Sequence, residues 1–198
     1  MVSSITLKNL IIGYRSKHQL RAIASPVHAS LQAGELTCLI GANGVGKSTL
    51  LRTLAGFQPA LDGEILIQDK SLSDFSAQEL AREISIVLTS KTDHAQLSAE
   101  EIVGIGRSPY TGFWGTLSAA DKQIVAAALQ EAGILHLAQR NISELSDGER
   151  QKVMIAKALA QQTRITRAVR PPVLPHHVRG HAPAWPACQL WWHHQVSQ

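Results

Sequence analysis

The sequence predicts an α/β fold, and three observations support this prediction. Segments typical of strands dominate the first third of the chain, among them residues 5–14 and the wholly apolar residues 36–40. Strand-like and helix-like segments then alternate, and helix-like segments dominate towards residue 160. A glycine-rich segment, residues 41–48, lies between an apolar strand and a helix. Together these features indicate an α/β core with a helical insertion at about residues 90–145.

The composition is that of an ordinary globular protein. The chain has 198 residues, of which 44% are hydrophobic and 17% are charged, so it can bury the core of one domain with a small subdomain. Its two cysteines, Cys38 and Cys188, match neither a zinc site nor a disulfide framework, which favours a reducing compartment. No apolar run reaches the ~18–20 residues of a membrane span, and the N-terminal residues lack a signal-peptide layout. We therefore expect a soluble cytosolic chain, or one that a partner holds at a membrane.

Local patterns place the individual elements. A serine followed three residues later by an acid favours a helix start, because each side chain can bond the backbone N–H of the other. This pattern predicts helices after Ser76, Ser98 and Ser118, and a further helix follows residues 145–149. Gly56 is expected to stop the helix that follows the glycine-rich segment. The expected strands are residues 5–14, 36–40, 64–68 and 84–89.

Residues 41–48 carry the clearest chemical signal. They read GANGVGKS and match the P-loop pattern G-x-x-x-x-G-K-[ST]. Glycines let several backbone N–H groups point at one phosphate, and the start of the following helix attracts anions. This pattern predicts that Lys47 reaches the β- and γ-phosphates of ATP and that the Ser48 hydroxyl binds Mg²⁺. The expected nucleotide-binding residues here are Gly41, Asn43, Gly44, Gly46, Lys47, Ser48 and Thr49.

About a hundred residues later the chain reads LSDGE, residues 145–149, directly before a helix. With the P-loop, this segment resembles the signature motif of the ABC-transporter ATPases, whose usual form is LSGGQ. The resemblance implies that Ser146, Gly148 and Glu149 contact the γ-phosphate of ATP bound at the P-loop of a second subunit. Asp147 replaces the first glycine of the motif and should weaken that contact unless its side chain turns away.

Three further segments extend the resemblance over roughly residues 3–164. Tyr14 stands where the family has an aromatic residue that stacks on adenine, although a tyrosine at a strand end can also simply pack in the core. Ser90 stands where the family has a glutamine that contacts Mg²⁺, and the serine side chain has a shorter reach. The pattern Gly-Arg-x-Pro-Tyr at residues 106–110 is similar to that of importer ATPases for iron chelates (siderophores), haem and cobalamin.

The resemblance also implies a fold, partners and a location. The fold would be a P-loop NTPase domain of the ABC ATPase type at residues 1–164, with a β-rich N-terminal part and a helical subdomain at about residues 90–145. The subunit would form a homodimer that holds two ATP molecules and would act on membrane-spanning permease subunits. It would be a peripheral protein at the cytoplasmic face of the inner membrane, and no nucleic acid would be a partner.

The last part of the chain departs from the family. The family continues with an apolar strand ending in Asp and Glu, of which the Asp holds Mg²⁺ through water and the Glu activates the attacking water. This chain has no Asp or Glu after Glu149, so no general-base Glu can be identified, and the domain is interpreted as truncated before this Walker B strand. Residues 165–198 hold many of the prolines, histidines and tryptophans without a helix or strand period. We expect an aberrant, disordered tail and a chain deficient in hydrolysis.

A frameshift accounts most simply for this ending. The codons CGA GCC GTC CGC would encode Arg167–Arg170, and loss of the first base gives Glu-Pro-Ser, which follows the Asp in the family. In that frame the Thr166 codon does not supply the Asp itself.

Other interpretations remain open at this point. The chain could be a non-catalytic nucleotide-binding fragment without a transport role, or a soluble ABC-type ATPase of DNA repair or translation. The tail could also bind a transition metal, although its spacing matches no closed site. The candidate ligands are His176, His177, His181, Cys188, His193 and His194.

Overall fold

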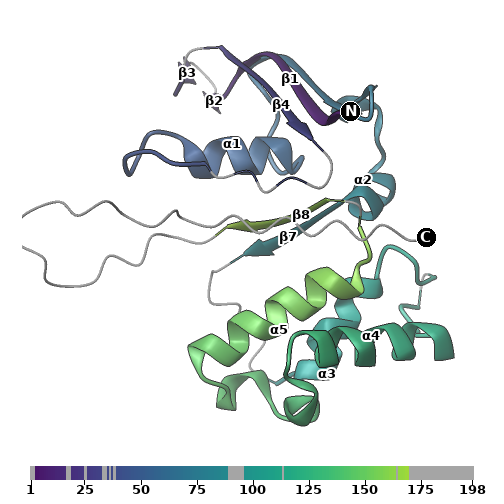
Figure 1. The fold of residues 1–198 in the computed structure, drawn as a ribbon. Coiled ribbons are helices and arrows are strands. Elements are labelled where there is room, and N and C mark those ends of the chain that lie inside the picture. Colours follow the sequence, from purple (N-terminus) through teal and green to yellow (C-terminus); the bar gives the residue numbers. More distant parts are fainter. Residues whose placement is uncertain are drawn as a thin grey trace, which may run out of the picture. The chain divides into compact units, whose positions relative to one another are not determined.

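The computed structural model describes residues 3–16, 19–24, 26–32, 35, 37, 39–88, 96–112, 114–163 and 165–169. The described residues divide into two compact units, of which the first comprises the residues up to Phe75 together with residues 168–169, and the second comprises residues 76–167. Figure 1 labels the α-helices and most of the strands.

The first unit contains an antiparallel sheet with the strand order β4-β1-β5-β6. Strand β1 pairs with β4 on one side and with β5 on the other. A separate hairpin is formed by β2 and β3, in which Tyr14 lies opposite Arg21. The elements of this unit are β1 (Ser3–Ile11), β2 (Gly13–Ser16), β3 (Gln19–Ala22), β4 (Val27–Gln32), helix α1 (Lys47–Leu54), β5 (Asp62–Ile67), β6 (Lys70–Ser71) and the short helix η1 (Leu72–Asp74).

Two strand predictions in this unit need correction. The expected single strand at residues 5–14 is divided, because β1 ends at Ile11 and β2 begins at Gly13. The strand expected at residues 36–40 lies partly outside the described residues, and Thr37, Leu39 and Ile40 have no regular secondary structure.

Apolar residues of β1 and β5 form most of the core of the first unit. Ile5 and Leu7 of β1 are buried, whereas Lys8 is exposed and lies 3.8 Å from Glu64. Burial of such side chains is the main favourable contribution to folding. The buried apolar residues of this unit are Ile5, Leu7, Leu10, Ile12, Leu54, Ala55, Ile65, Leu66 and Ile67.

The second unit is mainly helical, and its helices α3, α4 and α5 pack together around one core (Figure 1). The helices predicted after Ser76, Ser98 and Ser118 are confirmed, and each begins with a complete capping box. The elements are α2 (Ala77–Glu83), β7 (Ile84–Leu88), α3 (Ala99–Gly104), η2 (Ile105–Arg107), α4 (Ala119–Glu131), η3 (Leu135–Leu137), η4 (Ile142–Glu144), α5 (Asp147–Ala160) and the first three residues of β8 (Ile165–Val169).

Strand β8 corrects the expectation of an irregular tail from residue 165. Residues 165–169 form a strand that pairs with β7. The segment reads ITRAV and contains three β-branched residues, which favour strands. The rest of the expected tail, residues 170–198, lies outside the described residues, as do its candidate metal ligands.

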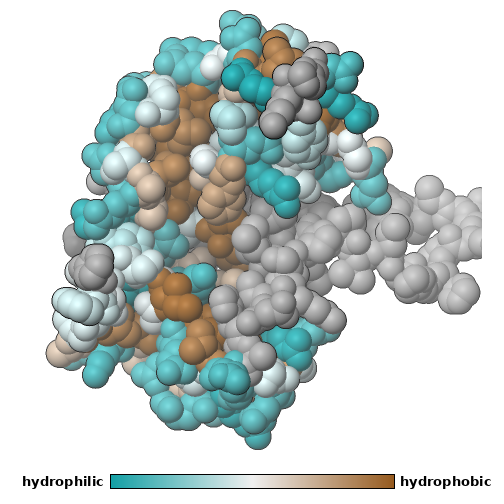
Figure 2. Space-filling view, turned by 180° about the vertical axis from the view of Figure 1, so that it is seen from behind, coloured by the Kyte–Doolittle hydropathy of each residue, from teal (hydrophilic) through white to brown (hydrophobic). Residues whose placement is uncertain are grey.

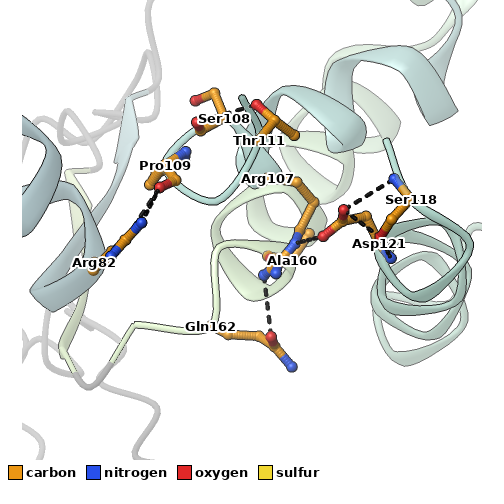
Figure 3. Close-up of polar contacts among 9 residues, drawn as sticks. All are labelled: Arg82, Arg107, Ser108, Pro109, Thr111, Ser118, Asp121, Ala160 and Gln162. Carbon is orange, nitrogen blue, oxygen red and sulfur yellow. Dashed lines mark hydrogen bonds and ion pairs between the residues drawn. The ribbon is translucent and has the colours of Figure 1, made fainter. Parts of the chain in front are cut away.

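A buried arginine connects three elements of the second unit (Figure 3). Arg107 is 5% exposed, and its Nε donates a hydrogen bond to Oδ1 of Asp121 at 2.9 Å. Its Nη1 donates to the carbonyl oxygen of Ala160 at 2.9 Å and to Oε1 of Gln162 at 3.0 Å. Asp121 also caps α4 through Ser118. The guanidinium therefore joins the segment after α3 to the start of α4 and to the end of α5, where a cation is favourable.

The segment after Arg107 is held by a second set of bonds. The carbonyl oxygen of Pro109 accepts hydrogen bonds from Nε and Nη2 of Arg82 at 3.1 and 2.9 Å (Figure 3). It also accepts one from Nε2 of Gln78 at 3.0 Å. The ring of Tyr110 lies 4.1 Å from the guanidinium of Arg107 and 5.3 Å from that of Arg82. Cation–π contacts of this kind add to the hydrogen bonds. The segment that carries the Gly-Arg-x-Pro-Tyr pattern is therefore firmly anchored on α2.

On the face shown in Figure 2, hydrophobic patches lie among hydrophilic residues. No helix of the described residues is long and apolar enough to cross a membrane. Those residues also contain no cluster of three or more His, Cys, Asp or Glu side chains that could hold a metal ion. Large apolar side chains that are more than half exposed are Leu20, Ile40, Val45, Phe57 and Trp114.

Gly106 is a point where a side chain should not be tolerated. A Cβ atom built there would lie 2.3 Å from the backbone carbonyl oxygen of Lys157 in α5. We expect Gly106→Ala to lower the free energy of unfolding by about 1–3 kcal/mol. Gly112→Ala is the matched control, since its Cβ would meet no atom within 4 Å. Urea titrations followed by circular dichroism would contradict the packing argument if both variants had the same midpoint.

Asp121 should make the second unit sensitive to acid. Hydrogen bonds from Ser118 and then from Arg107 lower its pKa from 3.8 to about 2. A lowered folded-state pKa contributes stability above the ordinary pKa and loses it as the pH falls towards the folded value. We therefore expect the unaltered chain to be more stable than Asp121→Asn at pH 6, and this difference to shrink between about pH 4 and pH 2. Denaturation at a series of pH values measures it, and a difference independent of pH would refute the assignment.

Candidate nucleotide-binding site

The glycine-rich segment forms an exposed loop between Ile40 and helix α1. Gly44 and Gly46 have φ angles of 82° and 103°, a region that residues with a side chain rarely adopt. Gly46 also allows close packing, because a Cβ there would lie 2.7 Å from Cγ2 of Ile23. The loop therefore needs glycine at these two positions for its backbone conformation.

The loop leads directly into the N-terminus of α1. No side chain caps this helix start, and its first turn contains no acidic residue. The other four α-helices of the described residues each begin with a capping box and with an acid in the first turn. Since the first N–H groups of a helix have no partner within the helix, an uncapped and positively polarised start suits an anion.

Lys47 places a positive charge over the same loop. Its Nζ donates hydrogen bonds to the carbonyl oxygens of Gly41 at 2.7 Å and Ala42 at 2.8 Å. The ammonium group is therefore next to the backbone that the glycines shape. A loop of this shape, with a lysine and a free helix start, can bind phosphate groups.

The residues that follow Lys47 differ in exposure. Ser48 is exposed, whereas Thr49 is only 5% exposed. The Oγ1 of Thr49 is hydrogen-bonded to the hydroxyl of Tyr14 at 3.1 Å. Tyr14 comes from β2, is 49% exposed, and so presents part of its ring to solvent beside the start of α1. The structure thus brings Tyr14 and the P-loop together within the first unit.

The LSDGE segment lies in the second unit and begins α5. Ser146 is the N-cap, and its hydroxyl donates a hydrogen bond to Oε2 of Glu149 at 2.7 Å. Hydrogen bonds from the Ser146 side chain and backbone lower the pKa of Glu149. Asp147 is turned towards Arg150, with Oδ1 and Nη1 at 3.5 Å, and it remains well exposed. Arg150 also donates to the carbonyl oxygen of Leu145 at 2.8 Å, which fixes the turn before α5.

Two features of the LSDGE segment were missed from the sequence. The Ser146-x-x-Glu149 spacing is the same capping-box signal that predicted the other helices, so it could have been found. The hydrogen bond from Arg150 to the carbonyl oxygen of Leu145 has no comparable sequence pattern, because every residue has a backbone carbonyl group. Ser90, the expected Mg²⁺ contact, lies outside the described residues. Asn43 and Gly148 are exposed.

The sequence is similar to those of known ABC transporter proteins. The sequence profile of the ABC transporter family matches residues 24–167. An uncharacterised ABC transporter ATP-binding protein of Haemophilus influenzae is 42% identical, over 80% of this chain and 59% of that protein. The iron(3+)-hydroxamate import ATP-binding protein of Bacillus subtilis is 34% identical, over 83% of this chain and 60% of that protein. A hemin import ATP-binding protein of Bordetella pertussis is 40% identical, over 70% of this chain and 52% of that protein. The chain thus spans a little over half the length of these relatives.

The fold agrees with the sequence comparison. A dimeric ATP-binding cassette in a post-hydrolysis state, bound to ADP and phosphate, is 25% identical with a TM-score of 0.70, over 83% of this chain and 72% of that one. The resemblance drawn from the P-loop and the LSDGE segment is therefore confirmed. With the family profile covering residues 24–167, the chain belongs to the ABC transporter family and has the ABC ATPase fold.

Proposed function

We propose that this chain is the ATP-binding subunit of an ABC importer for an iron chelate, haem or cobalamin. The observation that carries the proposal is the start of α1, which has no side-chain cap and lies behind a loop that Gly44 and Gly46 shape. Lys47 adds a cation at the same place. Triphosphate is the kind of anion that such a site suits.

Each residue of the site has a distinct part in binding ATP. The loop N–H groups and Lys47 would bind the phosphate oxygens, and the exposed face of Tyr14 would stack on the adenine. The Ser48 hydroxyl is exposed at the start of α1 and would be a ligand of Mg²⁺. In nucleotide sites Mg²⁺ usually has only a few protein ligands, and phosphate oxygens and water complete its coordination. Mg²⁺ bound in this way neutralises charge on the phosphates.

The names of relatives and of a similar structure support the proposed cargo and partners. Relatives in Bacillus subtilis and Bordetella pertussis are named for iron(3+)-hydroxamate import and hemin import. The dimeric ATP-binding cassette supports a homodimer. In this proposed homodimer the LSDGE segment of one subunit would face ATP of the other. We propose that the subunit acts on membrane-spanning permease subunits, as an importer of this family requires. We place the assembled subunit at the cytoplasmic face of the inner membrane.

We further propose that this chain hydrolyses ATP poorly. Strand β8 follows α5, but its residues ITRAV include no acid, and no Asp or Glu occurs after Glu149. Without a carboxylate to orient the attacking water, the site keeps phosphate binding and loses general-base catalysis. A nucleotide-binding role without hydrolysis is therefore the second candidate function.

Lys47→Ala should weaken ATP binding roughly 10- to 100-fold, because a charge-assisted hydrogen bond to phosphate is lost. Lys8→Ala is the matched control, since it removes the same charge from an exposed ion pair with Glu64 in the same unit. Calorimetric titration with ATP and Mg²⁺ measures both variants. Equal affinities of Lys47→Ala and the unaltered chain for ATP would contradict the proposed function.

Steady-state hydrolysis of ATP by the purified chain should stay far below about 1 s⁻¹, the lower end of ordinary enzyme turnover. The physical reason is the absent general base. Phosphate release is measured for the unaltered chain beside Lys47→Ala, which defines the background. Turnover near 1 s⁻¹ that disappears in Lys47→Ala would show that another group activates the water.

A further inference from the structure

The hydroxyl of Tyr14 connects two elements that are far apart in the sequence. It lies 3.1 Å from Oγ1 of Thr49, and 35 residues separate the two. Thr49 is 5% exposed and belongs to the first turn of α1, whereas Tyr14 is 49% exposed. One end of the tyrosine is therefore fixed to a buried group while part of its ring faces solvent.

The hairpin that carries Tyr14 is also held without this bond. Nε2 of Gln58 donates a hydrogen bond to the carbonyl oxygen of Gly13, next to Tyr14. Ile23, just after β3, packs so closely on Gly46 that a Cβ there would clash. Because these contacts keep the hairpin on the P-loop segment, loss of the Tyr14 hydroxyl should leave the fold intact. The hydrogen bond of the Tyr14 hydroxyl therefore serves to fix the position of the Tyr14 ring rather than to hold the fold together.

The anchor lies in the same helix turn as the groups proposed to bind phosphate. Thr49 follows Lys47 by two residues, which is a rise of about 3 Å along a helix. A nucleotide joins its base and its phosphates covalently, so a ring fixed at a set distance from the phosphate site binds both parts at once. Fixing such a side chain before binding reduces the entropy lost on binding.

We propose that Thr49 is a positioning residue, which holds the Tyr14 ring through its hydroxyl so that the ring and the P-loop bind a nucleotide as one unit. This inference rests on the proposed function, because it assumes that ATP binds at the P-loop. It assigns to the Tyr14 hydroxyl a role separate from stacking. The hydrogen bond between Tyr14 and Thr49 should not change the affinity for a ligand that has phosphates and no base.

The test is a double-mutant cycle read with two probes, ATP and inorganic tripolyphosphate. Tyr14→Phe keeps the ring and Thr49→Val keeps the shape, and each removes one partner of the bond. We expect each variant to weaken ATP binding roughly three- to tenfold, and the double variant to be no weaker than the singles. Tyr14→Phe should leave tripolyphosphate binding unchanged, and Thr49→Ser should restore ATP binding.

The outcomes separate this inference from the proposed function. ATP binding unchanged by Tyr14→Phe, or additive losses in the double variant, would overturn the positioning role alone. Equal losses for ATP and tripolyphosphate would overturn it too, because they would indicate a general disturbance of the P-loop. If the unaltered chain bound neither probe, or if Lys47→Ala bound both equally well, the proposed function would fail and this inference with it.

Discussion

The N–H groups at the start of every helix need partners from outside the helix, and this constraint shapes both units of the chain. Four α-helices of the described residues meet it with their own side chains, each through a serine and an acid three residues later. Helix α1 begins instead at Gly46, without a side-chain cap and without an acid in its first turn. A capped start stabilises the fold, whereas the start of α1 remains available to an external anion. The contrast between these helices therefore distinguishes structural helix starts from the candidate binding site.

In the second unit the guanidinium group of Arg107 connects several elements. Arg107 is buried and bonds Asp121, Ala160 and Gln162, so the ends of two helices share one cation (Figure 3). Burial of a charge is costly unless it is paired and hydrogen-bonded, and Arg107 is paired with Asp121 and donates three hydrogen bonds. The same residue is the arginine of the Gly-Arg-x-Pro-Tyr pattern. A pattern first used to compare families thus has a physical role in anchoring the C-terminal end of α5, whose other end carries the LSDGE segment.

Local signals in the sequence were sufficient for much of the fold and for part of the site. The capping boxes depend on residues three apart, so the helices after Ser76 and Ser98 could be predicted, and the P-loop was recognised in the same way. The break between β1 and β2 was missed because the apolar pattern continues through it. Strand β8 was missed because prolines further along outweighed the β-branched residues of ITRAV. The bond between Tyr14 and Thr49 could not be predicted, since it depends on how a hairpin packs on a distant helix.

The two phosphate-binding segments proposed from the family are not equally ready for an anion. The start of α1 has no carboxylate, but at α5 the backbone N–H and the hydroxyl of Ser146 both donate to Oε2 of Glu149. Asp147 adds a second negative charge, which Arg150 offsets only in part because the pair is exposed. A phosphate that approaches Ser146 must therefore compete with the carboxylate of the chain itself. Capping and anion binding are alternative uses of the same donors, so the P-loop can bind phosphate directly, whereas the LSDGE segment must first give up a hydrogen bond that stabilises its own helix.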